Sequence, residues 1–183
     1  MYTNANTVQI AELAENILRK AVSSESVVVF DIDATVLFND ATEERCQSRR
    51  NTPITRLYDV AIRLNIPVFF VTARANTEAG RAFTFEQLRC LGLHHFAGMY
   101  MRPSVTGTSV QNISLYKKEC RKLIASLTGK SIALNIGDQW SDLFVCDVNT
   151  LRALNDAYGN TNLLFSSPAH SFSDWSLKLV DEE

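Results

Sequence analysis

The chain has 183 residues, which is enough for one domain with a buried hydrophobic core. Its 18 Lys and Arg residues against 20 Asp and Glu residues give a net charge of −2 and a pI near 5.9, so electrostatics offers no reason to expect a nucleic acid or an anionic membrane as a partner. No apolar run approaches transmembrane length and no signal peptide is visible, so we expect an intracellular, cytoplasmic protein that does not bind membranes.

Hydrophobic periodicity predicts helices and strands that alternate along the chain. Residues 7–22 have the pattern of an amphipathic N-terminal helix. The residues expected on its apolar stripe are Val8, Leu13, Ile17 and Val22. Residues 27–31 follow as an almost unbroken run of β-branched and aromatic side chains, which predicts a strand buried on both faces.

Residues 36–52 mix polar and charged side chains, and we expect a flap or small cap segment there rather than core. Pro53 then suits the first turn of a helix. Four further strands are predicted at 67–71, 98–101, 131–136 and 162–165, with helices at 78–91, 114–127 and 141–158. This alternation predicts an α/β fold, a Rossmann-like three-layer sandwich whose mostly parallel sheet has five strands, in a single domain spanning 1–183.

The cysteines are widely spaced along the chain and form no Cys-x-x-Cys pair. They are Cys46, Cys90, Cys120 and Cys146. Disulfides are rare in intracellular proteins, and this spacing is not that of a zinc site. We therefore expect four reduced, structural thiols.

Two carboxylates stand at the end of the first predicted strand, where Asp31 and Asp33 precede Thr35. Ligands bind at this edge of parallel sheets, and side chains two residues apart on an extended chain point the same way. Two anions held so close repel, and the usual remedies are a divalent cation or a raised pKa on one of them. An oxygen-rich strand end suits Mg²⁺. The pattern indicates metal-assisted chemistry on a phosphorylated substrate, with an Asp as nucleophile.

The second predicted strand runs into Thr72, Ala73 and Arg74. A hydroxyl directly after a buried strand can hydrogen-bond a phosphate oxygen, and the following turn supplies backbone N–H groups. A Thr that closes a strand is about as often a helix cap, so this segment leaves both roles open.

A pair of lysines, Lys117 and Lys118, follows Tyr116 in a predicted helix. Several carboxylates around a phosphoryl group require a fixed cation, and either lysine could supply it. The alternative is a solvated basic helix face, since Arg121 and Lys122 lie on the same helix.

Near the fourth predicted strand, the chain passes through Gly137 to Asp138, and Asp142 opens the next predicted helix. Asp138 can ligate Mg²⁺, and Asp142 could accept a hydrogen bond from the lysine. Capping of the helix by Ser141 or Asp142 is the alternative, and it is compatible with catalysis. All these groups are expected at one edge of the sheet. A phospho-receiver domain is excluded, because no strand between Asp33 and Thr72 offers its separate phosphoacceptor Asp.

The motifs together resemble those of the haloacid dehalogenase (HAD) superfamily, in particular its class B and plant acid phosphatase branch, which includes vegetative storage protein relatives. The motifs are Asp-x-Asp-x-Thr at 31–35, Thr-Ala-Arg at 72–74, Gly-Arg at 80–81, Tyr-Lys at 116–117 with Arg121, and Gly-Asp-Gln-Trp-Ser-Asp at 137–142. The resemblance spans about residues 26–166.

This resemblance implies a magnesium-dependent phosphomonoester hydrolase that works through an aspartyl-phosphate intermediate. By it, Asp31 would be the nucleophile and a metal ligand. Asp33 would ligate the metal through its backbone carbonyl and act as general acid and base. Asp138 would complete the metal site.

The same resemblance assigns the groups around the substrate. Thr72 and Lys117 would bind the phosphoryl group, Lys118 being the less favoured lysine, and the segment through Ala73 and Arg74 would line the site. For Arg74 a structural role is equally open. Asp142 would hold the lysine or a metal-bound water.

The sequence departs from the family in three ways: Ala34 replaces an acid, no leader is visible, and the segment between Thr35 and Thr72 is short. The cap should then be minimal and the site open, unless a neighbour in a homo-oligomer covers it. Two other functions remain open, a non-catalytic storage or binding protein on this scaffold and a phosphatase of nucleic-acid ends, which the acidic pI disfavours.

Overall fold

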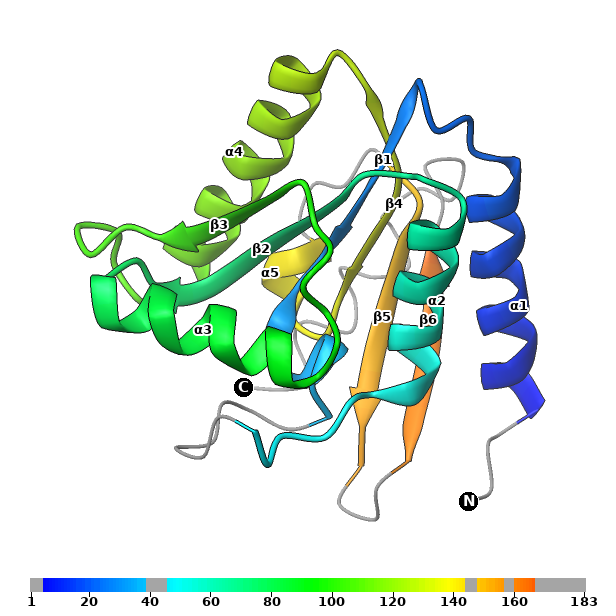
Figure 1. Cartoon of the computed structure of the whole chain (residues 1–183), viewed down its shortest axis with the longest axis horizontal. Coiled ribbons are helices and arrows are strands. Elements are labelled where there is room, and N and C mark those ends of the chain that lie inside the picture. The colour runs from blue at the N-terminus through cyan, green and yellow to red at the C-terminus, as the bar shows by residue number, and fades with distance from the viewer. Residues whose placement is uncertain (1–4, 39–45, 144–147, 157–159, 167–183) are drawn as a thin grey trace.

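The computed structural model of the chain describes residues 5–38, 46–143, 148–156 and 160–166. One six-stranded sheet runs through its centre in the order β3-β2-β1-β4-β5-β6 (Figure 1). Its strands are β1 (Ser26–Phe30), β2 (Val68–Ala75), β3 (Gly98–Arg102), β4 (Ser131–Gly137), β5 (Thr150–Asn155) and β6 (Thr161–Ser166). Neighbouring strands are parallel except that β6 is antiparallel to β5.

Helices cover both faces of the sheet, as the predicted three-layer α/β sandwich requires (Figure 1). The helices are α1 (Ala5–Lys20), α2 (Thr52–Arg63), α3 (Glu78–Cys90), α4 (Val110–Thr128) and the short α5 (Trp140–Leu143). α1, α2 and α3 lie on one side, and α4 with α5 on the other. The predicted fold class is therefore confirmed, with six strands instead of five. Among the described residues, no helix has the length and apolar character needed to span a bilayer.

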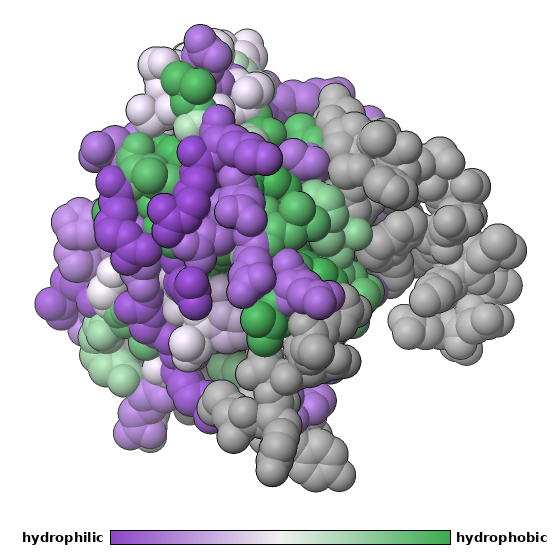
Figure 2. Space-filling model, turned by 90° about the vertical axis from the view of Figure 1, so that its right-hand side faces the viewer, coloured by the Kyte–Doolittle hydropathy of each residue, from purple (hydrophilic) through white to green (hydrophobic). Residues whose placement is uncertain are grey.

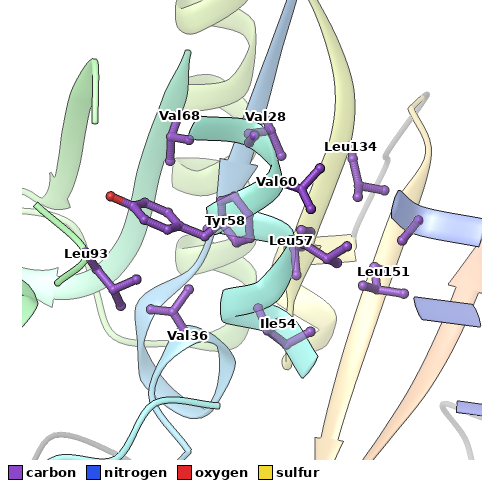
Figure 3. Packing of buried hydrophobic residues seen from close by; sticks show 14 of the residues in the cluster. Val28, Val36, Ile54, Leu57, Tyr58, Val60, Val68, Leu93, Leu134 and Leu151 are labelled. Atoms are coloured by element: carbon purple, nitrogen blue, oxygen red, sulfur yellow. The ribbon is translucent and has the colours of Figure 1, made fainter. Parts of the chain in front are cut away.

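The core that positions the site lies between α2 and the centre of the sheet. Ile54, Leu57 and Val60 of α2 point toward the sheet side of this core (Figure 3). Val28 of β1 and Val36, from the turn Ile32–Val36 that follows β1, are fully buried in the same cluster. Hydrophobic contacts thus anchor the turn next to the strand ends, where the sequence predicted the active site.

Residues 141–158 were predicted to be mostly helix, and this is wrong for their second half. α5 ends at Leu143, and 150–155 form β5. Leu, Arg and Ala in that stretch favour a helix by propensity. Pairing with β4 on one side and β6 on the other overrides this local preference, and it buries Leu151 and Ala153 in the core. The last residues of the predicted helix lie outside the described part of the chain.

The apolar stripe predicted for the N-terminal helix is also wrong in part. Val8, Leu13 and Val22 are about half exposed, whereas Ala14 and Leu18 are fully buried. α1 packs against α2 and β6, and small alanines at the contact let the helix approach closely. Figure 2 shows this side of the molecule, where hydrophilic side chains predominate and some hydrophobic ones reach the surface.

The prediction of four reduced thiols is wrong for two of them, because Cys46 and Cys90 form a disulfide. Forty-four positions separate them in the sequence, but the end of α3 lies beside the segment that leads into α2. Gln87 Nε2 also donates to Ser48 Oγ between the same two segments. Cys120 is a buried free thiol, as expected, and Cys146 lies outside the described residues.

The predicted flap, 36–52, is described only at its two ends. These ends pair with each other: Phe38 N donates to Arg49 O and Asn51 N to Val36 O. An antiparallel bridge joins Leu37 and Arg50 between them. Residues 39–45 lie outside the described residues. The described ends of the segment therefore lie side by side, between the turn Ile32–Val36 and the start of α2.

Reduction of the disulfide is expected to destabilise the fold. A cross-link that closes a loop of this length restricts the unfolded chain and typically contributes about 2–4 kcal/mol. Dithiothreitol should therefore lower the free energy of unfolding of the wild type, measured by urea titration, but should leave Cys46→Ser/Cys90→Ser unchanged. Cys120→Ala, which keeps the disulfide, should respond to reductant as the wild type does. Equal responses of the double variant and the wild type would contradict the prediction.

Candidate active site

The first component of the site is the carboxylate that ends β1. Asp31 is buried, and its backbone N–H donates to the carbonyl of Ile136 on β4 at 2.8 Å. The chain then turns through Ile32–Val36, in which Ala34 has a left-handed conformation with φ of 52°. This turn directs the next carboxylate, Asp33, away from Asp31.

A buried ammonium group from α4 joins two of the predicted acids. Lys117 Nζ lies 3.0 Å from Asp31 Oδ1 and 2.5 Å from Asp142 Oδ1, and its side chain is only 2% exposed. Lys118, on the same helix, is half-buried and has no such contact among the described residues. The structure therefore brings the favoured lysine of the pair to the site. A solvated basic face does not account for this contact.

Three carboxylates converge at the ends of β1 and β4. One oxygen from each of Asp31, Asp138 and Asp142 lies within 4.8 Å of the other two, and all three residues are buried. Gly137 makes this approach feasible, because a Cβ there would lie 2.3 Å from the Cβ of Asp142. Thr35 Oγ1 donates weakly to Asp138 at 3.4 Å. Grouped carboxylate oxygens are ligands for a hard divalent cation, so this donor set fits the predicted metal.

Asp33 lies beside this cluster rather than in it. Arg74 binds its carboxylate with two hydrogen bonds, Nε to Oδ2 at 2.8 Å and Nη2 to Oδ1 at 2.6 Å. The third guanidinium nitrogen donates to Thr84 Oγ1 on α3. Arg74 was predicted to line the substrate site, and in this structure its fork is occupied by Asp33.

The predicted phosphate segment lies at the end of β2. Thr72 is buried, and its hydroxyl accepts a hydrogen bond from the backbone N–H of Arg74 at 3.2 Å. The carbonyl of Ala73 accepts from Arg102 Nε at 3.0 Å, which ties the segment to the end of β3. The helix that follows has its own cap, since Thr77 Oγ1 accepts from Gly80 N. The alternative role of Thr72 as the cap of α3 is thus excluded.

A family profile described as the HAD superfamily, subfamily IIIB (acid phosphatase), matches residues 40–161. The chain belongs to this family. The match covers more than half of the sequence and begins after the Asp-x-Asp-x-Thr motif, so the first strand end is additional to it. Membership of the acid phosphatase family confirms the resemblance predicted from the motifs.

Solved structures agree with the fold. A chain in "Structure of Pnkp1/Rnl/Hen1 complex" is 21% identical with a TM-score of 0.53, and one in "Structure of the Pnkp1/Rnl/Hen1 RNA repair complex" is 19% identical with a TM-score of 0.52. Both similarities cover 67% of this chain, which spans only 42% and 39% of those chains.

The core domain of a putative phosphoglycolate phosphatase from Streptococcus pneumoniae TIGR4 is 15% identical and has a TM-score of 0.42, with 87% of this chain and 97% of that chain covered. No curated protein matches the sequence.

Burial controls the ionisation of the acidic cluster. Burial raises the pKa of Asp31 well above its ordinary value, and the neighbouring carboxylates of Asp142 and Asp138 add to this against the opposing attraction of Lys117. Burial also raises the pKa of Asp138. Burial alone would lower the pKa of Lys117, but the carboxylates of Asp142 and Asp31 raise it, so the ammonium stays charged.

Several residues that hold the site were not predicted. Asn135 Nδ2 donates to the carbonyl of Asp142, and Arg152 Nε donates to the carbonyl of Asp138, each at 2.8 Å. Gln139 Nε2 donates to the carboxylate of Asp138 at 2.5 Å. Gln139 lies within a recognised motif and could have been found there. Asn135 and Arg152 act through backbone carbonyls, for which the sequence carries no signal.

A cavity of about 410 Å³ lies away from this cluster, between α1, the start of α2 and the ends of the β5–β6 connection. Val8, Phe38, Arg49 and Thr161 are among its lining residues, and none of the predicted site residues lines it. The candidate active site is therefore at the edge of the sheet and not in this cavity.

Removal of the buried ammonium should destabilise the protein strongly. Lys117→Met would leave Asp31 and Asp142 facing each other without a cation, and breaking such a buried pair costs about 3–5 kcal/mol. Lys122→Met, on the exposed face of the same helix, removes only a surface pair with Glu119 and should cost less than about 1 kcal/mol. Urea unfolding in EDTA at pH 7 compares them. Similar losses in the two variants would refute the buried-charge assignment.

The raised pKa values of Asp31 and Asp138 predict how stability depends on pH without metal. A group whose pKa is higher in the folded than in the unfolded state favours folding below its unfolded value, here about 3.8, and loses that contribution as the pH rises through the folded value. The free energy of unfolding of the wild type, relative to Asp138→Asn, should fall as the pH rises above about 4 in EDTA. Added Mg²⁺ should reduce this fall, because it binds the ionised carboxylates. A relative stability that rises with pH in EDTA would contradict this.

Proposed function

We propose that this phosphatase is a magnesium-dependent phosphomonoester hydrolase that forms an aspartyl-phosphate on Asp31. The observation that carries the proposal is the buried Asp31 carboxylate, held 3.0 Å from Lys117 Nζ. Asp33 follows two residues later, and its side chain is partly exposed. A fixed nucleophile beside a fixed cation is what phosphoryl transfer requires of a protein, since positioning and charge stabilisation provide most of the catalysis.

In the first step, a carboxylate oxygen of Asp31 attacks phosphorus and the bond from phosphorus to the alcohol oxygen breaks. Asp33, in its protonated form, gives its proton to that leaving oxygen. Lys117 stabilises the charge on the transferring group. Thr72 supports the phosphoryl oxygens through its hydroxyl, and the backbone after Ala73 lines the same side.

In the second step, a water molecule attacks the phosphorus of the aspartyl-phosphate, and Asp33 accepts a proton from this water. The bond between phosphorus and the Asp31 oxygen breaks, which releases inorganic phosphate and restores the carboxylate. Asp33 is then protonated again and ready for the next alcohol. Each proton that leaves Asp33 in the first step is thereby returned in the second.

Asp31 and Asp138, with the backbone carbonyl of Asp33, would hold Mg²⁺, and Asp142 would support the lysine or a water bound to the ion. When bound, the ion neutralises negative charge on the transferring phosphoryl group. The three clustered carboxylates carry more negative charge than Lys117 can balance, and this excess supports a divalent cation.

Arg74 has a double role in this proposal. In the free protein its guanidinium holds the Asp33 carboxylate at both oxygens. A phosphoryl group bound at Thr72 would compete for the same fork, since phosphate and carboxylate present similar oxygens to a guanidinium. Substrate binding would then release Asp33 from its ion pair with Arg74.

The substrate that we propose is a small phosphomonoester. The net charge of −2 provides no attraction for a polynucleotide, and the similarity to chains of an RNA repair complex is at 21% identity or below, which concerns the fold alone. The residues argued to meet the phosphoryl group follow β1 and β2 or, in the case of Lys117, reach the same sheet edge from α4.

The decisive test is hydrolysis of p-nitrophenyl phosphate with Mg²⁺ and with EDTA. Wild-type turnover should require the metal, Asp31→Asn should abolish it, and Asp33→Asn should lower kcat by about 10²–10⁴-fold because it removes the general acid and base. Asp59→Asn makes the same chemical change at a carboxylate paired with Arg50 and should retain wild-type rates. Near-normal turnover by Asp31→Asn, or an inactive wild type across a broad panel of phosphomonoesters, would refute the proposal.

A further inference from the structure

One side chain at the end of β5 binds both sides of the nucleophile turn. Asn155 Nδ2 donates to the carbonyl of Ala34 at 2.7 Å and to the carbonyl of Phe38 at 2.8 Å. Ala34 follows Asp33 directly, and Phe38 lies just beyond the turn Ile32–Val36. The two hydrogens of a single amide therefore connect a distant strand to the backbone that carries the catalytic carboxylates.

The acceptor side of the same amide is also occupied. Asn155 Oδ1 lies 2.7 Å from Thr161 Oγ1 and 3.3 Å from Asn51 Nδ2, and both of these donors are buried. Both hydrogens of the amide thus have partners, and its oxygen accepts from Asn51 Nδ2 and shares the single hydroxyl hydrogen of Thr161 with Asn51 Oδ1. This arrangement indicates which end of the amide is nitrogen, because a flip would place Oδ1 against the two carbonyl oxygens of Ala34 and Phe38.

The turn needs support of this kind. Ala34 adopts φ of 52°, a left-handed conformation that is costly for a residue with a Cβ, whereas Asp33 before it is extended. Such a conformation persists only when surrounding contacts over-determine it. A backbone hydrogen bond from Leu37 N to Ile32 O joins the ends of the turn, and Asn155 adds two hydrogen bonds from outside.

We propose that Asn155 is a positioning residue for the phosphatase reaction, which sets the turn Ile32–Val36 that follows Asp31 and carries Asp33, without touching the substrate. This inference rests on the function proposed above. Its physical content is that the two carboxylates keep their relative position only while both carbonyls are bound. A misplacement of about 1 Å at such a site can cost about 10²-fold in rate.

The test compares Asn155→Asp with Thr161→Val. The first keeps the shape of the side chain but removes both donors to the turn. The second removes a hydroxyl on the opposite side of the same network and leaves both donors in place. Asn155→Asp should lower kcat on p-nitrophenyl phosphate by about 10–100-fold with KM within about threefold of wild type, because the groups that bind phosphate are untouched. Thr161→Val should keep kcat within about threefold.

Hydrogen exchange provides a readout that does not depend on turnover. The backbone N–H of Leu37 should exchange at least about tenfold faster in Asn155→Asp than in Thr161→Val. The reason is that Asn155→Asp removes the side-chain NH₂ group that holds the turn. If Asn155→Asp does not fold, Asn155→Ser, which can donate to only one carbonyl, takes its place with the same expectations.

Equal kcat and equal Leu37 exchange in the two variants would overturn the inference, as would a loss confined to KM. An inactive wild type would reject the proposed function, and the exchange rates alone would then decide whether Asn155 holds the turn.

Discussion

The buried ammonium of Lys117 is the interaction on which the rest of this site depends. Three carboxylates from β1, β4 and the start of α5 gather within a few ångströms, and without a cation their repulsion would oppose the packing of these elements. α4 must therefore be held so that one lysine reaches the sheet edge. Cys120 and Ile124 pack the helix against β1 and β2, and Ser109 caps its start. The contacts that pack α4 against the sheet therefore also bring Lys117 to the site.

Lys117 balances only part of this charge. Burial raises the pKa of Asp31 and of Asp138, so ionisation of these groups opposes folding. A bound divalent cation would relieve this repulsion. Functional sites often lower the stability of the folded state in this way, because their groups are placed to stabilise a transition state and not the ligand-free protein.

The residues of the site could be predicted from the sequence better than the residues that hold them in place. Asp31, Thr72 and Asp138 follow buried strands, and parallel strands bring their carboxyl ends to one edge, so the proximity of these residues follows from hydrophobic patterning and connectivity. Asn155 and Arg152 bind backbone carbonyls, which every residue possesses, so no motif marks them. They also lie in β5, a stretch that was predicted as helix because its residues favour a helix by local propensity. The disulfide was missed for a related reason, since only the tertiary structure brings the end of α3 to Cys46.

That disulfide also connects the segment around Cys46 to the contacts that hold Asp33. Cys46 is linked to Cys90 at the end of α3, and the buried Thr84 on the same helix accepts a hydrogen bond from Arg74. Arg74 in turn holds the Asp33 carboxylate. A displacement of α3 would therefore reach Asp33 through two polar contacts, while the covalent link ties α3 to the segment that pairs with the end of the turn Ile32–Val36. Asp33 is thus supported from the α3 side by Arg74 and from the β5 side by Asn155, which restricts its motion more than either contact could alone.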